Sequence, residues 1–421
     1  MKFTILIMNI SQKMKPILVK LLPIEVLRKI KKRVVNNAAA KMNAHEQLPF
    51  ERRAFPDGVN LVGYVRGEIG LGQSCRLVAG GLSAAEIPFT IFNYEQVSAI
   101  RQTDDTWLHK ITDTTPFNVN IFHINPYELP LAFIRLGVNM WSKRYNIVYW
   151  LWELEKFPRD WENALLLADE IWTPAEFVSE SIRGVTDKPV HTIPYALTVP
   201  QCGDYCRDFF NLPADKLLFL CMYDCNSTME RKNPLGAIAA YKKAFAAGGK
   251  ETGLIIKVNN PQAKELQRLQ SELAGYSNVY IIAKVLDKPQ INALIACADV
   301  YISLHRAEGF GLVPAEAMLL GTPVVATNWS ANAEFMTTDV ACMVDYKLIN
   351  IEKDCGHYKA GNRWADPDIH QAAEFLQKLH ADEDFRNNLA KKAKAQITKQ
   401  FHPAIITQLM RNRLSEIYNE A

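Results

Sequence analysis

The 421-residue sequence lacks any apolar run of the roughly 18 residues that a membrane-spanning helix needs. It has no internal repeat and no low-complexity tract, and no small-residue cleavage site follows its short apolar start. The eight cysteines are scattered, and no histidine pair accompanies Cys202/Cys206 or Cys221/Cys225. Free thiols in a reducing cytosol are therefore favoured over disulfides or zinc, and we expect a cytoplasmic protein.

The net charge of +3 is small, but its distribution is uneven. Residues 1–53 carry twelve Lys/Arg against three Glu, so this segment has a charge of +9 and the remainder −6. Within residues 13–33, apolar residues recur at helical spacing among eight cations, and Pro16 and Pro23 divide the pattern into two short helices. Such a segment suits an anionic membrane surface, which would make the protein peripheral at the inner face of the cell membrane. A solvated tail or a helix docked on the protein itself is the alternative.

Strand and helix patterns alternate from Asn60 onwards, which is typical of doubly wound α/β domains. The chain is long enough for two to three domains. We predict a basic amphipathic extension over 1–53, a first Rossmann-like domain over 54–200 and a second over 201–401. A C-terminal helix over 402–421 is predicted to pack back on the first domain.

The most informative segment follows the apolar strand Val300 to Leu304. Glu308 and Glu316 lie eight positions apart, the glycine turn Gly309-Phe310-Gly311 follows the first, and a helix pattern begins at Pro314. A strand, a glycine loop and a helix N-terminus together aim backbone N–H groups at a phosphate. Carboxylates repel a phosphate but accept hydrogen bonds from sugar hydroxyls. The segment therefore predicts a nucleotide-sugar site.

Ser303 to Met336 resembles the E-x7-E signature of retaining glycosyltransferases of the GT-B architecture, in family four (glycosyl transferases group 1), including the core Glu308 to Leu312. The resemblance implies two Rossmann-like domains facing each other across a cleft. It also implies that Glu308 is catalytic and binds the transferred sugar, that Glu316 binds ribose hydroxyls, and that the backbone of residues 309–311 holds phosphate. The nucleotide-sugar is a substrate, so no cofactor is expected.

A second anion site is predicted after the strand Leu217–Met222. Arg231 and Lys232 stand immediately before a helix opened by Asn233 and Pro234, and cations at a helix N-terminus favour a diphosphate. The stretch from Ser227 to Pro234 resembles the family's phosphate-binding S-x-x-x-R-K-N-P loop. Two further donor-side candidates are Lys257, at the end of a strand, and Leu286, in a turn that lies against the nucleobase in relatives.

Acceptor-side candidates come from the first domain. The loop Gly63 to Ser74 carries Arg66, Gly67, Gly70 and Gly72, but its glycine spacing does not fit the G-x-G-x-x-G dinucleotide fingerprint. The family resemblance places this loop near the donor phosphates and the acceptor. His123 and Asn125 end a strand, and relatives carry a catalytic-site histidine near this point that contacts the transferred sugar. Glu153 ends the next strand, where it could contact a sugar acceptor.

We therefore expect a retaining, metal-independent glycosyltransferase that moves a hexose from GDP-mannose or a UDP-sugar to a glycan or lipid-linked acceptor in cell-surface polysaccharide or glycolipid synthesis. Metal independence follows from the lack of a D-x-D pair at a strand end. No nucleic-acid partner is expected. One alternative is an NAD-dependent two-domain oxidoreductase, which the glycine spacing disfavours. The other is a non-catalytic membrane-surface adaptor, which the intact Glu308, Glu316, Arg231 and Lys232 disfavour.

Overall fold

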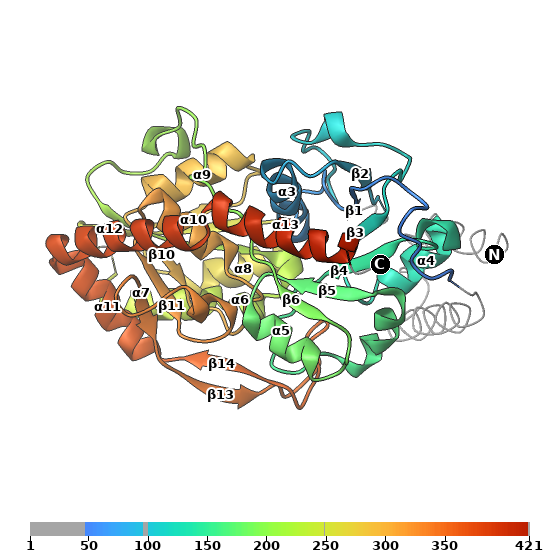
Figure 1. Cartoon of the computed structure of the whole chain (residues 1–421). Helices are drawn as coiled ribbons and strands as arrows, with labels where there is room; N and C mark the ends of the chain where they lie inside the picture. The colour runs from blue at the N-terminus through green and yellow to red at the C-terminus, as the bar shows by residue number, and fades with distance from the viewer. Residues whose placement is uncertain (1–46, 96–99, 248, 420–421) are drawn as a thin grey trace.

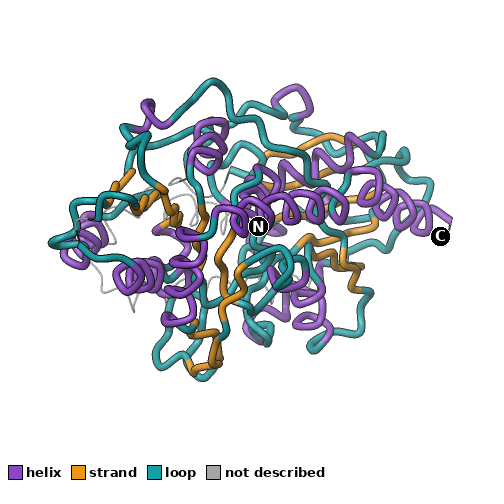
Figure 2. The backbone as a smooth tube through the Cα atoms, turned by 90° about the vertical axis from the view of Figure 1, so that its left-hand side faces the viewer, coloured by secondary structure: helices purple, strands orange, loops and turns teal. Residues whose placement is uncertain are grey.

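The structure, a computed structural model, describes residues 47–95, 100–247 and 249–419 (Figure 1). In this part of the chain the strands form two parallel six-stranded sheets and one antiparallel pair. Helices lie on both sides of the parallel sheets (Figure 2). The predicted α/β architecture of two Rossmann-like domains is confirmed. The basic segment over residues 13–33 lies outside the described residues.

The first sheet has the order β2-β1-β3-β4-β5-β6. Every residue of β1 and β3 is buried, because helices cover both faces of a parallel sheet. The strands are β1 (Val59–Gly63), β2 (Phe89–Asn93), β3 (Val119–His123), β4 (Tyr145–Tyr149), β5 (Glu170–Thr173) and β6 (Val190–Thr192). The helices are α3 (Gly70–Ala84), α4 (Leu129–Leu136) and α5 (Glu176–Arg183), with 3-10 turns η1 (Leu108–Lys110), η2 (Val138–Met140) and η3 (Arg159–Leu167).

The second sheet has the order β12-β11-β10-β7-β8-β9. Its strands are β7 (Leu217–Asp224), β8 (Thr252–Asn259), β9 (Val279–Ile282), β10 (Val300–Ser303), β11 (Val324–Thr327) and β12 (Cys342–Val344). Its helices are α6 (Met229–Lys232), α7 (Pro234–Ala244), α8 (Ala263–Glu272), α9 (Lys288–Cys297), α10 (Leu312–Leu320), α11 (Ile369–Ala381) and α12 (Glu383–Gln400), with 3-10 turns η4 (Arg207–Phe210), η5 (Cys225–Ser227) and η6 (Ala331–Glu334). In both sheets the carboxyl ends of the strands are where ligands bind in such folds.

An antiparallel hairpin, which the sequence analysis did not anticipate, follows the second sheet. It consists of β13 (Tyr346–Asn350) and β14 (Arg363–Pro367), and the loop 351–362 joins them. No residue of β13 is fully buried, so the strand lacks the apolar alternation that would identify it in a sequence. Its loop reaches the first domain, where His357 stacks on Tyr127 with ring centroids 4.2 Å apart.

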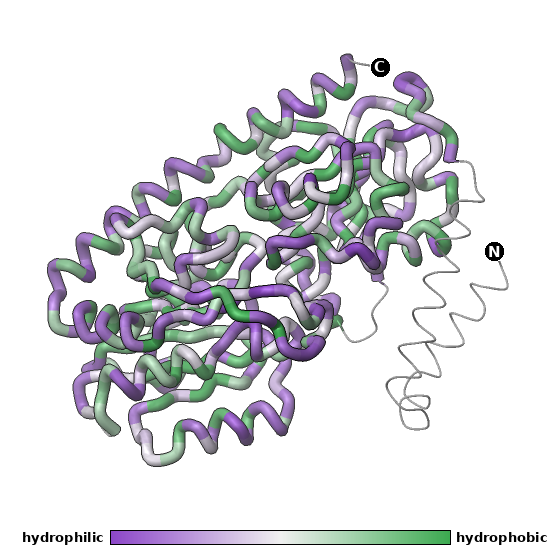
Figure 3. The backbone as a smooth tube through the Cα atoms, turned by 90° about the horizontal axis from the view of Figure 1, so that it is seen from below, coloured by the Kyte–Doolittle hydropathy of each residue, from purple (hydrophilic) through white to green (hydrophobic). Residues whose placement is uncertain are grey.

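The last helix, α13 (Pro403–Asn419), returns to the first domain and packs against α3 (Figure 1). Hydrophilic and hydrophobic residues alternate along it in Figure 3, as expected for a helix with one buried side. Arg413 on α13 forms an ion pair with the fully buried Glu170 of β5, at 2.6 Å. No helix among the described residues is both long and apolar enough to cross a membrane.

Candidate functional site

The glycine loop after β10 is shaped by two close approaches. Gly311 has a φ of 91° and caps the N-terminus of α10, and an added Cβ would lie 2.9 Å from the Cβ of Asn332. A Cβ on Gly309 would lie 3.2 Å from the backbone oxygen of Trp152, which belongs to the first domain. The loop therefore needs glycine both for its backbone conformation and for its contact with the other domain. Helix α10 begins at Leu312, two residues before the predicted start at Pro314.

Glu308 precedes this loop and is buried among cations. Its carboxylate pairs with the Lys232 ammonium, and Arg231 Nη1 lies 3.5 Å from its second oxygen. Its backbone N–H donates a hydrogen bond of 2.9 Å to Ser330 Oγ. Burial alone would raise the pKa of Glu308, but Lys232 and Arg231 outweigh burial and lower it to about 2. Glu308 is therefore an anion at neutral pH, held where two cations could also meet a diphosphate.

Arg231 and Lys232 precede the helix α7 as predicted, and they are also the last two residues of a short helix, α6, that was not predicted. Asn233 follows in the left-handed conformation with a φ of 49°, and α7 begins at Pro234. The Asn233 amide donates to the Leu304 carbonyl at 2.8 Å, and its side-chain oxygen accepts from the Gly236 N–H. These bonds join the cation-bearing turn to the end of β10. Arg231 and Glu308 are thus fixed on neighbouring segments, although they are 77 positions apart in the sequence.

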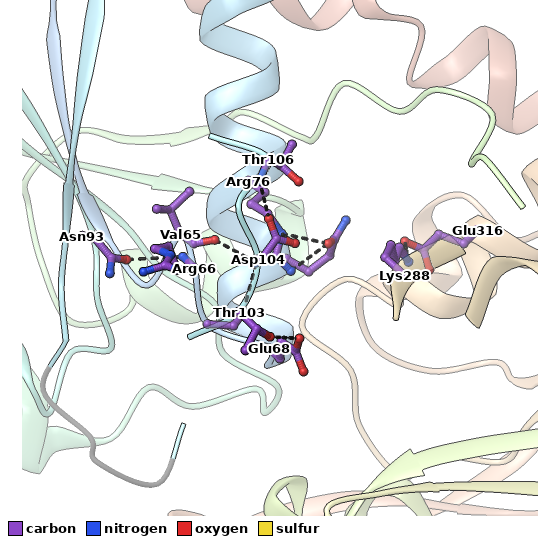
Figure 4. A network of polar contacts seen from close by, with 12 residues as sticks. Val65, Arg66, Glu68, Arg76, Asn93, Thr103, Asp104, Thr106, Lys288 and Glu316 are labelled. Carbon is purple, nitrogen blue, oxygen red and sulfur yellow. Dashed lines mark hydrogen bonds and ion pairs between the residues drawn. The ribbon is translucent and has the colours of Figure 1, made fainter. Parts of the chain in front are cut away.

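Glu316 projects from α10 and is buried with only 5% of its surface exposed. It forms an ion pair of 2.6 Å with Lys288, the first residue of α9. Figure 4 shows this pair facing the first domain, on the side of Arg76 and Asp104. The sequence analysis missed Lys288, although it adjoins the turn 284–287 that was singled out for its likeness to the nucleobase turn. Lys288 contacts Glu316 only in the folded protein, so the spacing of the two residues in the sequence does not predict their ion pair.

Arg76 of α3 stabilises the first-domain glycine loop through hydrogen bonds to its backbone. The sequence analysis missed this residue as well. Arg76 donates to the carbonyls of Val65 and Gly67 at 2.8 and 3.0 Å and pairs with Asp104 at 3.2 Å (Figure 4). A Cβ on Gly72 would lie 2.0 Å from the Gly67 carbonyl oxygen, so that position excludes every other residue.

Two more residues of this loop make ion pairs within the first domain. Arg66 pairs with Asp105 at 2.7 Å, and Glu68 pairs with Arg101 at 3.0 Å. Around Gly70, by contrast, an added Cβ would meet no atom within 4 Å. The loop is therefore preorganised by its own domain, with open space at its tip.

His123 ends β3, but its side chain is fully buried. Its Nε2 lies 2.7 Å from Ser74 Oγ, and Ser74 also bonds the Tyr195 hydroxyl. Burial lowers the pKa of His123 to about 4, so the imidazole is neutral at pH 7. The Tyr195 ring lies 4.9 Å from that of Phe310, which connects His123 to the glycine loop through intermediates. Its contact with a transferred sugar stays a prediction.

The other predicted residues occupy different positions around this centre. Asn125 donates to the Tyr127 hydroxyl at 3.1 Å and to Glu128 at 3.2 Å. Glu153 reaches across from the first domain to within 3.8 Å of Arg231 Nη2. Ser227 closes the 3-10 turn η5 before α6 and is half-buried. Leu312 is half-buried at the start of α10.

Lys257 and Leu286 adjoin a cavity of about 380 Å³. Burial lowers the pKa of the fully buried Lys257 to about 8, and its Nζ donates to Asn259 Oδ1 at 2.6 Å. Asn259 lines the cavity together with Ala283 and Val285 of the second domain, and Arg101 of the first domain closes one side. Leu286 is buried directly after Val285. Lys257 therefore does not line the cavity itself but contacts the lining residue Asn259.

Comparisons with known structures define the class of fold. Sucrose-phosphate synthase from Thermosynechococcus elongatus aligns with 86% of this chain and 100% of its own, with a TM-score of 0.62 at 14% identity. A glycosyltransferase from Rickettsia africae aligns with 87% and 100%, with a TM-score of 0.62 at 11% identity. HepE from Anabaena aligns with 86% and 100%, with a TM-score of 0.59 at 15% identity. The chain has the GT-B fold.

The match to a family model covers a smaller part of the chain than the structural alignments do. Residues 226–349 match the family model described as "Glycosyl transferases group 1". The matched segment contains α6, the glycine loop and α10, so it carries the residues on which the resemblance was based. No curated protein matches the sequence.

The ion pairs of Glu308 predict a pH-dependent contribution to stability. The pKa of this carboxyl falls from 4.5 to about 2 on folding, so its contribution is present above pH 4.5 and is lost as the pH falls towards 2. We expect wild type to exceed Glu308→Gln in free energy of unfolding by a margin that shrinks by on the order of 3 kcal/mol over this window. Denaturant titrations at several pH values measure it.

Lys232→Met supplies the control, because Lys232 is the main cause of the lowered pKa. In that background the pH-dependent part of the difference between Glu308 and Gln should be smaller. A margin that does not change with pH in either background would show that the carboxylate is not stabilised by these cations.

Proposed function

We propose that the protein is a retaining glycosyltransferase that transfers a hexose from a nucleotide-sugar to a glycan or lipid-linked acceptor. The observation that carries the proposal is the arrangement around the glycine loop. Glu308 and Glu316 flank the loop and the N-terminus of α10, and Arg231 and Lys232 lie against Glu308. Cations, a helix N-terminus and two carboxylates in one place suit a substrate with a diphosphate and two sets of hydroxyls.

The arrangement supports a specific division of labour. When a glycosidic bond to a diphosphate breaks, negative charge develops on the leaving oxygen, and Arg231 and Lys232 are placed to stabilise it. Glu308 would then exchange its pairing with Lys232 for hydroxyl groups of the sugar, near a developing oxocarbenium-like charge. Glu316 would accept hydrogen bonds from the ribose. These roles require that the donor bind between the ends of β7 and β10.

The cavity beside Asn259 and Val285 supports a nucleobase position, because it lies at the carboxyl ends of β8 and β9 in the same sheet. Its walls come from both domains, since Arg101 contributes from the first. GDP-mannose and a UDP-sugar remain the two donors we propose. HepE has been crystallised with UDP-glucose, and TarM from Staphylococcus aureus with UDP, fondaparinux and alpha-GlcNAc-glycerol, which favours a uracil base and a glycan acceptor.

Removing either half of the donor site should weaken nucleotide binding without unfolding the protein. Each charge-assisted hydrogen bond contributes about 1.5–3 kcal/mol, so Glu316→Ala and Arg231→Ala should each reduce affinity for UDP or GDP tenfold or more. Isothermal calorimetry measures the affinities, and Lys264→Ala on the exposed face of α8 is the control. Wild-type affinity in both site variants would disprove the donor-site assignment.

The stereochemistry of the product provides an independent test. The E-x7-E resemblance predicts retention of anomeric configuration, and the lack of a D-x-D pair predicts activity without divalent metal. Product analysis by NMR, with EDTA present, should therefore show a linkage with the configuration of the donor. An inverted linkage, or activity that disappears on chelation, contradicts this part of the proposal.

A peripheral location at the membrane is proposed from residues 13–33 alone, which carry eight cations and one Glu around apolar positions. Attraction of this kind decays within about 8 Å at physiological salt, so binding to anionic vesicles should weaken as salt rises. Deletion of residues 1–46 should reduce co-sedimentation with such vesicles while nucleotide affinity stays unchanged. If the truncated protein sediments equally, residues 13–33 do not mediate membrane binding.

A further inference from the structure

The loop 351–362 between β13 and β14 brings one aromatic side chain to the centre of the candidate site. Tyr358 is buried with 7% of its surface exposed. Its ring stacks on Trp152 of the first domain, with centroids 5.6 Å apart and planes at 22°. Arg231 Cζ lies 5.7 Å from the centroid of the same ring. Tyr358 therefore stands between the two domains, directly beside the donor-site arginine.

The loop is built to hold Tyr358 in place. The Cys355 N–H donates to the Tyr358 carbonyl at 2.9 Å, and the Tyr358 N–H donates to the Cys355 carbonyl at 3.0 Å. Outside this turn, Arg363 of β14 pairs with Glu155 of the first domain at 3.1 Å. The hairpin is thus attached to the first domain at several points, although it belongs to the second domain in the sequence.

Arg231 depends on these neighbours for its orientation. Its Nη1 donates to the Ala307 carbonyl at 2.8 Å, while its Nε has no hydrogen-bond partner among the described residues. Within its own domain Arg231 also pairs with the Glu308 carboxylate, which lies 3.5 Å from Nη1. Two further neighbours come from outside its own sheet, namely Glu153 of the first domain at 3.8 Å and the Tyr358 ring. Burial raises the pKa of the Tyr358 hydroxyl well above its ordinary value; the Arg231 charge opposes this rise, and the Glu153 carboxylate adds to it. A ring face close to a guanidinium attracts it electrostatically, and burial strengthens that attraction.

We infer that Tyr358 is a positioning residue for the diphosphate leaving group. Its ring holds the Arg231 guanidinium against the glycine loop, and it does so only while the hairpin contacts the first domain through Trp152. The inference rests on the proposed function, since it assumes that Arg231 binds the donor diphosphate. It adds a residue beyond the matched segment 226–349 to the donor site. It also makes the orientation of that arginine dependent on contact between the domains.

Two substitutions distinguish the effect of the aromatic ring of Tyr358 from the effect of its apolar bulk. Tyr358→Phe keeps the aromatic face, whereas Tyr358→Leu keeps apolar bulk and removes it. We expect Tyr358→Leu to bind UDP or GDP about three- to tenfold more weakly by calorimetry, and Tyr358→Phe to stay within about twofold of wild type. Tyr346→Leu, on the same hairpin but against Trp329, is the matched control and should bind as wild type does. Equal affinity of Tyr358→Leu and wild type overturns the inference.

A double-mutant cycle with Arg231→Lys tests whether Tyr358 acts through Arg231. An ammonium retains the charge but not the planar guanidinium, so the further loss caused by Tyr358→Leu should largely disappear in the Arg231→Lys background. Fully additive losses would show that Tyr358 supports the fold generally, and would overturn the inference. A wild-type protein that binds neither UDP nor GDP overturns the proposed function and this inference with it. Wild-type binding that is insensitive to Tyr358 overturns only the inference.

Discussion

A buried guanidinium is the constraint around which both domains are arranged. Removing the Arg231 charge from water is costly, and such a charge is tolerated only when oppositely charged and polar groups surround it. Its partners come from three separate parts of the chain: the glycine loop through Ala307 and Glu308, the first domain through Glu153, and the hairpin loop through Tyr358. The position of one charge therefore determines where the two domains and the hairpin meet.

Backbone conformations around this charge are also unusual. Thr228, Asn233 and Ser330 all have positive φ, at 64°, 49° and 73°. Each such residue costs of order 1–3 kcal/mol, so the surrounding bonds must impose the conformation. For two of these residues, local hydrogen bonds offset the conformational free-energy cost, because Asn233 caps α7 and Ser330 accepts the backbone N–H of Glu308. Three of the seven non-glycine residues with positive φ in the described part of the chain thus lie on the segments around Arg231 and Glu308.

The sequence predicted the features that depend on local spacing. Glu308, the glycine turn and Glu316 lie within nine residues, and the backbone of one loop and one helix turn places them. The fold also followed from local patterns, because each strand of a parallel sheet is a short apolar run. What could not be predicted were encounters between distant segments. Lys288 meets Glu316 from a separate helix, and Tyr358 lies in a hairpin whose first strand has no apolar alternation. Likewise, a histidine at a strand end can turn inward, as His123 does when Ser74 supplies its partner.

The return of α13 to the first domain has a consequence for how the chain folds during synthesis. The first sheet is complete at residue 192, yet Glu170 in β5 is neutralised by Arg413, which follows the whole second domain. A Cβ on Gly81 of α3 would lie 2.8 Å from Met410 of α13, so part of the first domain is shaped for a helix that is made last. A first domain emerging from the ribosome therefore has the Glu170 carboxylate without its cationic partner, although Tyr145 and Trp172 already donate hydrogen bonds to it. The face of α3 that α13 covers is also still exposed at that stage. Its final stability is acquired only after the second domain has been synthesised, which couples the completion of one domain to the folding of the other.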